Sequence, residues 1–521
     1  MNTTGFLTIA TAIVPDRPAM IFEGKRISYA ELEIRVNRLS NSLAELGVGA
    51  GDRVAMLQVN CNQYIEAYFA TARLDAVFVP INYRTRADEL THMLNDAAPK
   101  VIFVGGRYVR LVKECADNVE SLDHFVTLED DVEGWHSYDS LIENGDEYER
   151  VPEDDDDDLT MILFTSGTTS FPKGVMLSHD SFASYILATV TPADPVEETS
   201  NILTVPLYHI AGVQSVMAAI FAGRTLIIQR QFEAKQWMEL VERESVNRAM
   251  MVPTMLKMLM DHPEFHAHDL SSLEVITYGA APMPVPVIRQ AIKEFPGTSF
   301  INAFGQTETA ATITMLPPDD HVLEGDEEEI ERKLKHLGSI GKPLEDVDVR
   351  IFDEDGEPVA LGETGEIAAR GARLMKGYWN QEDATAETIR GGWLFTGDLG
   401  YQDEDGYIYL AGRAKDFIKR GGEMVSPEEV EQVILSHEAV EEAAIIGVPD
   451  LDWGERVRAL VVLRNGAQAS EDDISEYCRQ RLASFKKPES VVFCEELPRN
   501  QMGKVLKRIL KEEYSYPVVV E

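Results

Sequence analysis

Two stretches of the chain alternate short apolar runs with segments of helical periodicity, and this alternation constrains the fold more than any other feature. The first stretch extends from Ile27 to about Val104, and the second from Ile202 to about Phe304. Their apolar runs, which we expect to be strands, are residues 53–58, 76–80 and 101–104 in the first and 225–228, 248–252, 273–278 and 299–303 in the second. Strands that alternate with helices form βαβ units in parallel sheets. The sequence therefore predicts two α/β units.

Two further regions follow these units. Beyond Gly338, short apolar runs alternate with turns such as Asp353-Glu354-Asp355-Gly356, which indicates a small β-rich subdomain. Beyond Gly412 we expect a compact α+β unit, with helices at residues 427–436 and 471–482 and a strand at 457–463.

The predicted fold class is therefore α/β in two domains. A large N-terminal domain, residues 1–411, would contain both α/β subdomains and the β-rich subdomain. Residues 412–416 would form a hinge, and residues 417–521 a small, mobile α+β C-terminal domain.

The charge of the chain restricts its partners. It has 89 Asp and Glu against 48 Lys and Arg, a formal net charge of −41. Such a surface repels nucleic acid phosphates and anionic lipid, so we expect no nucleic acid partner. Anionic substrates must be held by local positive charge. A well-solvated surface explains the acidity better than adaptation to a high-salt host does, and the acidity defines no mechanism.

Cysteine spacing and hydropathy give little sign of metal, redox or membrane function. Four cysteines lie far apart without CxxC spacing, and no secretory signal pattern opens the chain. The largely apolar residues 203–228 are interrupted by Pro206, His209, Gln214 and Arg224, which favours strand, helix and strand over a membrane span. We expect a cytoplasmic protein without an integral membrane segment and leave a homodimer open.

The strongest local motif follows the apolar run at residues 161–164. It reads Thr165-Ser166-Gly167-Thr168-Thr169-Ser170-Phe171-Pro172-Lys173-Gly174. Glycines let backbone N–H groups approach phosphate oxygens, hydroxyls bind phosphate or Mg²⁺, and Lys173 supplies positive charge. Pro172 and Gly174 depart from the Walker pattern, which weakens a kinase or GTPase reading. The motif alone is compatible with an ordinary turn.

The motif resembles the signature of the adenylate-forming superfamily, which contains acyl-CoA synthetases, adenylation domains of peptide synthetases and luciferases. The resemblance extends over nearly the whole chain. Its other motifs, in order, are Pro206-Leu207-Tyr208-His209, Tyr278-Gly279-Ala280-Ala281-Pro282, Asn302-Ala303-Phe304-Gly305-Gln306-Thr307-Glu308, Gly338-Ser339-Ile340-Gly341-Lys342-Pro343, Trp393-Leu394-Phe395-Thr396-Gly397-Asp398, Gly412-Arg413-Ala414-Lys415-Asp416 and Pro498-Arg499-Asn500-Gln501-Met502-Gly503-Lys504.

This resemblance implies an AMP-forming acid–CoA ligase. Such an enzyme joins a carboxylic acid to AMP, releases pyrophosphate and transfers the acyl group to coenzyme A. Its co-substrates would be ATP and coenzyme A, and its metal ion Mg²⁺. Because the first step brings two anions together, positive charge and close positioning matter more than an acid or base.

The resemblance also implies roles for individual residues in ATP binding. Phe304 matches the aromatic residue that lies against adenine, Asp398 and Arg413 match contacts to the ribose, and Thr168 with Glu308 matches the magnesium ligands. Lys504 matches the catalytic lysine that contacts the carboxylate and the α-phosphate. The remaining ATP-binding candidates are Thr165, Ser166, Gly167, Thr169, Lys173, Gly279, Ala280, Ala281, Asn302, Ala303, Gly305, Gln306 and Thr307.

A catalytic lysine on the small domain implies that this domain closes for adenylation and then rotates. Lys415 matches the family hinge, and Gly421 with Gly422 matches the glycines that approach the pantetheine of coenzyme A. The chain departs from the family pattern at Asn500, where threonine is common, and at Lys507, where arginine is common. Neither position carries an assigned chemical role.

The acyl pocket is expected to include His209, Gly279 and Gly305, and His209 is also a catalytic candidate near the thioester site. Gly305 occupies the position where acetate-specific relatives have tryptophan, so glycine predicts room for a medium- or long-chain or cyclic hydrophobic acid. The remaining alternatives are an acyl-AMP ligase that loads a carrier protein, a luciferase-like oxygenase and a non-catalytic nucleotide-binding relative. The presence of Glu308, Asp398 and Lys504 disfavours the last.

Overall fold

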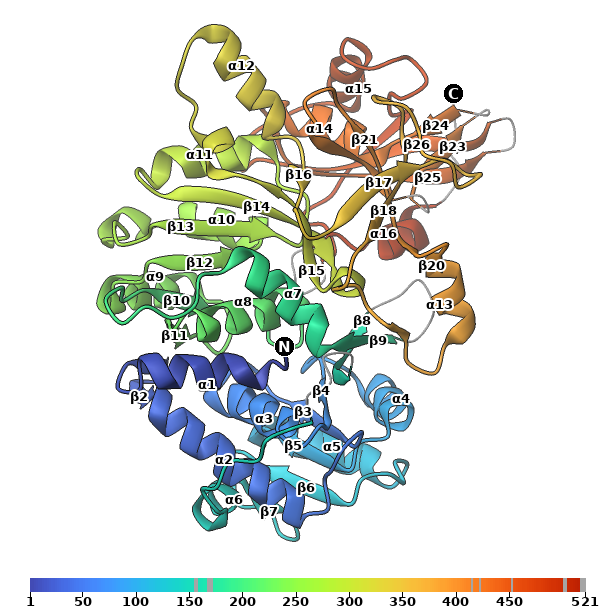
Figure 1. Cartoon of the computed structure of the whole chain (residues 1–521). Helices are drawn as coiled ribbons and strands as arrows, with labels where there is room; N and C mark the ends of the chain where they lie inside the picture. Colours follow the sequence, from blue (N-terminus) through green and yellow to red (C-terminus); the bar gives the residue numbers. More distant parts are fainter. Residues whose placement is uncertain are drawn as a thin grey trace.

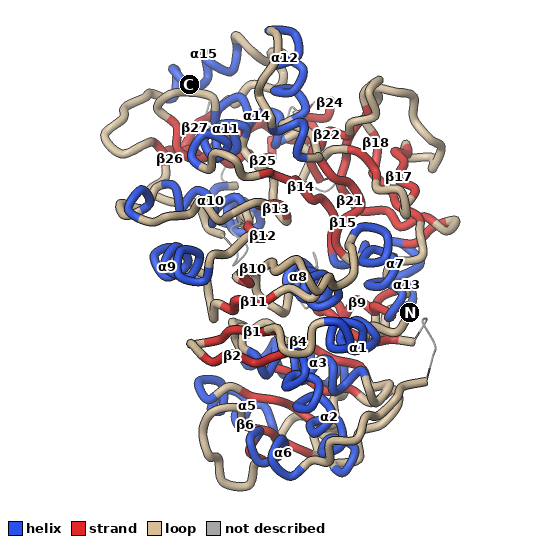
Figure 2. Tube along the Cα trace, turned by 60° about the vertical axis from the view of Figure 1, so that its left-hand side comes forward, coloured by secondary structure: helices blue, strands red, loops and turns tan. Residues whose placement is uncertain are grey.

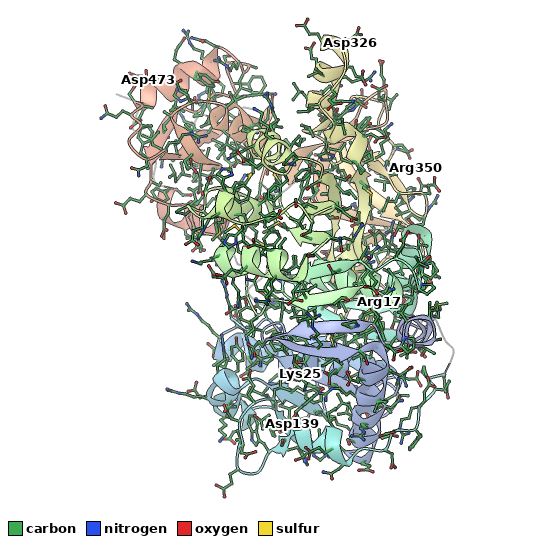
Figure 3. The ribbon with its side chains drawn as sticks, turned by 90° about the vertical axis from the view of Figure 1, so that its left-hand side faces the viewer. Arg17, Lys25, Asp139, Asp326, Arg350 and Asp473 are labelled. Carbon is green, nitrogen blue, oxygen red and sulfur yellow. The ribbon has the colours of Figure 1, made fainter. Side chains whose placement is uncertain are left out.

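The computed structural model describes residues 1–153, 158–165, 172–413, 416–420, 423–450, 453–499 and 504–515. Figure 1 shows one α/β subdomain, which contains β3 to β7, at one end of the molecule, a second α/β subdomain in the middle, and the β-rich and C-terminal units at the other end. In Figure 3, Asp139 marks the first end, whereas Asp326 and Asp473 mark the opposite one. The structure confirms the predicted fold class.

The first α/β subdomain is built on a sheet with the strand order β19-β9-β8-β4-β3-β5-β6-β7. Its strands are β3 (Arg53–Leu57), β4 (Val77–Pro80), β5 (Val101–Val104), β6 (His124–Thr127), β7 (His136–Ser137), β8 (Leu159–Thr165), β9 (Lys173–Ser178) and β19 (Gly377–Tyr378). Its helices are α2 (Tyr29–Glu45), α3 (Asn62–Ala72), α4 (Ala87–Ala97), η1 (Gly106–Tyr108), α5 (Val109–Ala116) and α6 (Tyr138–Asn144). Strands β8 to β7 of this order are parallel, whereas β9 turns back antiparallel to β8.

The second sheet has the order β16-β15-β14-β13-β12-β10-β11-β1-β2. Its strands are β1 (Pro18–Phe22), β2 (Lys25–Ser28), β10 (Ser200–Leu203), β11 (Thr225–Ile228), β12 (Arg248–Met251), β13 (Val275–Gly279), β14 (Ser299–Gln306), β15 (Ala311–Leu316) and β16 (Lys342–Pro343). The helices of this part are α1 (Thr4–Ile13), α7 (His179–Thr189), α8 (Ile210–Phe221), α9 (Ala234–Glu244), α10 (Pro253–Met260), η2 (Phe265–Ala267), α11 (Val285–Glu294), η3 (Thr307–Thr309), η4 (Pro318–His321) and α12 (Glu327–His336). Figure 2 shows α9 and α10 on one face of this sheet and α7 and α8 on the other.

The β-rich subdomain is a sheet in the order β17-β18-β21-β20, with β22 paired to β21. Its elements are β17 (Asp348–Phe352), β18 (Gly365–Arg370), α13 (Glu382–Thr388), β20 (Ile389–Arg390), β21 (Trp393–Gln402) and β22 (Ile408–Arg413).

The C-terminal domain has its own sheet, ordered β24-β23-β26-β25 with β27 beside β26. Its elements are β23 (Ile418–Arg420), β24 (Glu423–Val425), α14 (Pro427–Leu435), β25 (Val440–Asp450), β26 (Gly454–Leu463), α15 (Glu471–Arg479), β27 (Ser490–Phe493) and α16 (Lys507–Tyr514). Within it, the Nζ atom of Lys507 lies 2.8 Å from Glu431 and 3.5 Å from Glu428. Lys507, which departs from the family pattern, therefore belongs to a buried ion cluster.

Several local predictions are confirmed. The apolar stretch at residues 203–228 forms strand, helix and strand as β10, α8 and β11, and no helix among the described residues is both long and apolar enough to cross a membrane. Each of the two sheets also includes strands from outside the two predicted stretches. Strand β1 pairs with β11, and β19 pairs with β9, so each sheet takes strands from distant segments. Hydrophobic periodicity reports local structure and carries no information on which sheet a strand joins.

Candidate active site

The phosphate-binding motif lies at the tip of the β8–β9 hairpin. Thr165 and Lys173 are paired across the two antiparallel strands, which places the hydroxyl and the ammonium group at the base of the same loop. Next to them, a Cβ atom on Gly174 would lie 2.8 Å from Ile162 Cγ2, so the motif's last glycine is needed for packing. The remaining candidates in the loop, Ser166, Gly167, Thr168 and Thr169, lie outside the described residues.

A chain of side-chain contacts joins this hairpin to the proposed magnesium ligand. The Nζ atom of Lys173 lies over the ring of Tyr378, 5.0 Å from the ring centroid. The Tyr378 hydroxyl donates a hydrogen bond to Glu308 Oε1 at 2.9 Å. Strand β19, which carries Tyr378, pairs with β9 and so holds this ring beside the hairpin. The sequence prediction missed Tyr378, although a glycine and two aromatic residues stand together at 377–379.

The adenine-site candidates come together at the ends of two parallel strands. Gly279 at the end of β13 pairs with Ala303 on β14. The amide of Asn302 is buried and donates to the Ser339 carbonyl at 3.2 Å, which connects β14 to the segment before β16. Ligands in open α/β sheets bind at the carboxyl ends of parallel strands. The geometry therefore fits the predicted nucleotide site.

Phe304 serves as a packing residue as well. Its half-buried ring packs against an apolar cluster that the second sheet and the β-rich subdomain share, with Ile313 and Ile340 from the one and Ile351 from the other. The adenine-binding role implied by the resemblance therefore applies to a side chain that packs where these two subdomains meet.

Backbone strain concentrates at the same place. Ala280 has φ +64°, and Ala310 and Ala311, just after the Thr307–Thr309 turn, have φ +49° and +83°. Left-handed backbone at residues other than glycine costs free energy and is enriched at binding sites. Ala280 is exposed, whereas Ala281 beside it is half-buried. This segment therefore presents small side chains on a strained turn.

Close backbone approach explains two glycines that were assigned to the acyl pocket. A Cβ atom on Gly279 would lie 2.1 Å from the Ala303 carbonyl oxygen, and one on Gly305 would lie 1.5 Å from the Ala311 carbonyl oxygen. Any side chain at either position would thus require the backbone to move. The glycine at position 305 is required by the β14–β15 pairing, so its presence does not by itself measure the room in the pocket.

The ribose candidates lie one strand away from these residues. Gln306 at the end of β14 donates to the Thr396 carbonyl at 3.3 Å, and Asp398 is two residues further along β21. Asp398 is 8% exposed, and its backbone N–H donates to Thr396 Oγ1 at 3.1 Å. Arg413 pairs with Asp398 in the β21–β22 ladder. The structure thus brings the adenine and ribose motifs together across the two subdomains.

His209 lies where the acyl site was predicted, at the N-terminal end of α8. Its ring is 4.5 Å from the Tyr208 ring, centroid to centroid. Burial lowers the pKa of His209 to about 4, so its imidazole is neutral near pH 7. Its backbone carbonyl accepts hydrogen bonds from Gly212 and Val213, which fixes the start of the helix. A neutral imidazole in low-dielectric surroundings fits a pocket for an apolar acyl group.

Lys504, the catalytic candidate, is exposed on the C-terminal domain. This domain meets the large domain through an ion pair between Lys257 on α10 and Glu441 on β25. The hinge candidate Lys415 and the coenzyme A candidates Gly421 and Gly422 lie outside the described residues, as do Asn500 and the three residues after it.

Comparison of the chain with known protein families identifies the family to which it belongs. The AMP-binding enzyme model matches residues 9–379, and the model of the AMP-binding enzyme C-terminal domain matches residues 429–504. The chain therefore belongs to the AMP-binding enzyme family. Within it, the chain belongs to the AMP-forming acyl-CoA ligases, a family of acid–thiol ligases that bind ATP and use coenzyme A.

Individual relatives act on different acids. Indoleacetate–CoA ligase of Aromatoleum aromaticum is 34% identical over 97% of each chain. Fatty acid–[acyl-carrier-protein] ligase ScoC of Streptomyces coeruleorubidus is 33% identical over 96% of this chain and 94% of its own. Among solved structures, ATP-bound MatB from Rhodopseudomonas palustris superimposes with a TM-score of 0.87 at 31% identity over 99% of both chains. The family is thus shown, whereas the acid differs among its members.

Proposed function

We propose that this ligase activates a medium- or long-chain or cyclic hydrophobic carboxylic acid and transfers it to coenzyme A. The observation that carries the proposal is the neutral, half-buried His209 at the start of α8, because a site for a charged or strongly polar acyl group would be expected to offer it a charged partner. The relative that acts on indoleacetate supports a bulky apolar substrate.

In the proposed first step, the acid carboxylate attacks the α-phosphorus of ATP, and pyrophosphate leaves. Lys173 would neutralise phosphate charge at the base of the hairpin, while Asp398 would accept hydrogen bonds from the ribose hydroxyls. Lys504 would approach the carboxylate and the α-phosphate when the C-terminal domain closes. Positioning and charge stabilisation of this kind account for most catalysis in phosphate chemistry.

Mg²⁺ fits the residues present at this site. The Tyr378 hydroxyl orients the Glu308 carboxylate through the hydrogen bond described above, and a hard carboxylate oxygen suits the ion. We propose that Glu308, with Thr168 from the loop, would hold Mg²⁺, which would neutralise charge on the phosphates. Tyr378 would orient the carboxylate for this task.

In the proposed second step, the thiol sulfur of coenzyme A attacks the acyl carbonyl carbon, and AMP leaves with the bonding electrons. Rotation about Lys415 would remove Lys504 and bring Gly421 and Gly422 beside the pantetheine arm. His209 would line the path of the acyl group as a neutral imidazole. Such a group can accept a hydrogen bond from the thiol, although a pKa of about 4 makes it a weak base.

The substrate proposal is tested with purified protein, ATP, Mg²⁺ and coenzyme A against acetate, hexanoate, palmitate, cyclohexanecarboxylate and phenylacetate. We expect acyl-CoA formation to be at least tenfold more efficient, by kcat/KM, with one of the larger acids than with acetate. Preference for acetate would contradict the proposed acid class while leaving the ligase class intact.

A second candidate, the loading of a carrier protein, is supported by the similarity to the Streptomyces carrier-protein ligase. The same assay separates the two. Formation of acyl-AMP without consumption of free coenzyme A, followed by transfer to an added phosphopantetheinyl carrier protein, would favour this alternative.

A further inference from the structure

Two hairpins of the β-rich subdomain have the same turn sequence, Asp-Glu-Asp-Gly, at residues 353–356 and 403–406. In each turn the first aspartate accepts hydrogen bonds through Oδ1 from backbone N–H groups two and four residues later, at 3.0 and 2.9 Å for Asp353 and 3.1 and 3.0 Å for Asp403. The glycines have φ +83° and +86°. The turn geometry therefore accounts for the first aspartate and the glycine at both places.

The second turn differs from the first because a buried histidine faces it. His336, the last residue of α12, is 4% exposed. Its Nδ1 atom lies 2.8 Å from Asp320 Oδ1, and its ring stacks on Tyr407 with 3.7 Å between centroids. The Tyr407 hydroxyl donates to the other oxygen of Asp320 at 2.8 Å. The imidazole is thus fixed by one hydrogen bond and one stacked ring.

The other ring nitrogen is directed at the turn. Among the described residues, His336 Nε2 is buried without a hydrogen-bond partner. One nitrogen of His336 and one carboxylate oxygen each of Asp403 and Asp405 lie within 4.8 Å of one another. Because Asp320 Oδ1 is bonded to Nδ1 at 2.8 Å, Nε2 is the ring nitrogen that remains for the two aspartates. A buried polar atom without a partner needs an explanation.

A bound cation explains it. Metal-binding histidines typically direct one ring nitrogen at a carboxylate and present the other to the ion, which is how Asp320 and His336 are arranged. One imidazole nitrogen with two carboxylate oxygens suits a first-row divalent ion, Zn²⁺ above all, and leaves a fourth position for water. Mg²⁺ prefers oxygen ligands alone.

We propose that His336, Asp403 and Asp405 form a binding site for a divalent transition-metal ion of the Zn²⁺ type, with Asp320 orienting the histidine. Ligand atoms of a tetrahedral zinc site are ~3.4 Å apart, so the group must contract slightly. The exposed side chain of Asp405 can rotate to do so. The site would tie the end of α12 to the β21–β22 turn (Figure 2).

Hydrogen bonds hold the Asp403 carboxylate in place. Its Oδ1 atom accepts from the Tyr407 backbone N–H at 3.0 Å, and its Oδ2 atom accepts from the Tyr409 hydroxyl at 3.1 Å. Lys335 Nζ lies 3.1 Å from Asp403 Oδ2, and its side chain is 57% exposed. An arriving ion can therefore displace this lysine into solvent.

The proposal does not depend on the substrate or the nucleotide-binding roles. Asp403 lies five residues beyond Asp398 along the β21 direction, a separation of roughly 17 Å in an extended strand. The experiment can therefore be done without ATP or acid, which keeps Mg²⁺-nucleotide binding out of the readout.

The test is calorimetric titration of the EDTA-treated full chain with ZnCl₂, together with thermal unfolding with and without the ion. We expect one zinc ion per chain and a rise in Tm. Asp405→Asn, which changes an exposed side chain, should weaken binding at least tenfold, and His336→Gln should abolish it. Asp355→Asn, the same change in the twin turn, should leave zinc affinity unchanged.

A control is needed for a pair of histidines elsewhere in the chain. His136 Nε2 and His124 Nδ1 lie 3.3 Å apart and could also bind zinc. His136→Gln should leave the high-affinity binding intact. Absence of zinc binding to the unchanged protein, equal affinity in Asp405→Asn, or loss of binding in His136→Gln would each overturn the proposal. If His336→Gln fails to fold, Asp405→Asn still tests the site, because it leaves the buried His336 in place.

Discussion

The nucleotide-binding face of the large domain and the C-terminal domain are built in different ways. On the large domain, the site candidates are joined to one another: Tyr378 to Glu308 and Gln306 to Thr396 from one sheet to another, and Asp398 to Arg413 within the β-rich sheet. In contrast, Lys504 is exposed on a domain that meets α10 through Lys257 and Glu441.

The apolar cores show the same division. Every core cluster of the described residues lies either before residue 411 or after residue 417, and none combines the two sides. Units with separate cores and polar contacts between them are expected to move relative to one another. We infer from this difference that ATP would be held by a preorganised surface, whereas Lys504, the catalytic candidate, would be delivered by a unit that can move away.

The largest effect that would sharpen this contrast is expected for Lys504→Ala. Removing the ammonium group should slow acyl-adenylate formation by about 10²-fold or more, because it takes away charge stabilisation in the transition state. Thioester formation from supplied acyl-AMP should remain within about threefold of the unchanged protein. Single-turnover assays of each half-reaction measure both, with Lys511→Ala on α16 as the matched control. An equal loss of rate in both half-reactions would mean that Lys504 is not needed for adenylation alone, and the contrast between the two regions would fail.

A smaller effect is expected for Tyr378→Phe, which keeps the ring beneath Lys173 and removes the hydrogen bond to Glu308. Loss of a hydrogen bond to a charged group costs about 1.5–3 kcal/mol, so adenylation should fall about 10- to 100-fold. Glu308→Gln should reduce the rate of adenylation at least as much. The apparent affinity for Mg²⁺, measured from the rate at varied Mg²⁺, should fall in both variants. An unchanged Mg²⁺ dependence would remove Tyr378 from the site.

His209 predicts how stability depends on pH. Its pKa is about 4 in the folded protein and about 6.5 when unfolded, so the unfolded chain binds more protons between these values. Stability should therefore fall as pH decreases from 6.5 towards 4, by up to about 3 kcal/mol from this group. His209→Asn should flatten that slope in urea unfolding curves. His321, whose burial also lowers its pKa to about 4, should keep its own contribution.

The smallest effect is expected at the contact between the domains. Exposed ion pairs contribute about 1 kcal/mol or less, so Glu441→Ala should increase amide hydrogen exchange in α10 by no more than about fivefold. Arg464→Ala, which removes the partner of Glu441 within its own domain at 3.5 Å, should not change exchange in α10. Increased exchange in both variants would mean that the effect is local to β25.

Sequence patterns could predict the fold class and the motifs because both depend on local order along the chain. Strand, turn and glycine signals around Thr165, Gly279 and Asp398 led to residues that the structure places near one another. Tyr378 could not be found in this way, since its role depends on the pairing of β19 with β9 across about two hundred residues. The domain boundaries and the roles of Lys415, Gly421 and Gly422 stay predictions.

The meaning of Gly305 also required three-dimensional information. The sequence predicted that a glycine here leaves room for a long acyl group, whereas the structure places the Ala311 carbonyl oxygen where the first side-chain atom would be. Tryptophan at this position would disturb β14 and β15 whatever the pocket size. A change in chain-length preference in Gly305→Trp would therefore not report on the pocket alone.

The central claim is that the chain couples an acid to coenzyme A through an adenylate. The most direct measurement is the product stoichiometry from ATP, Mg²⁺, coenzyme A and the best acid, quantified by chromatography. We predict one AMP, one pyrophosphate and one acyl-CoA per acid consumed, with AMP release dependent on the acid. Formation of ADP and phosphate, or AMP release that does not depend on the acid, would contradict the account.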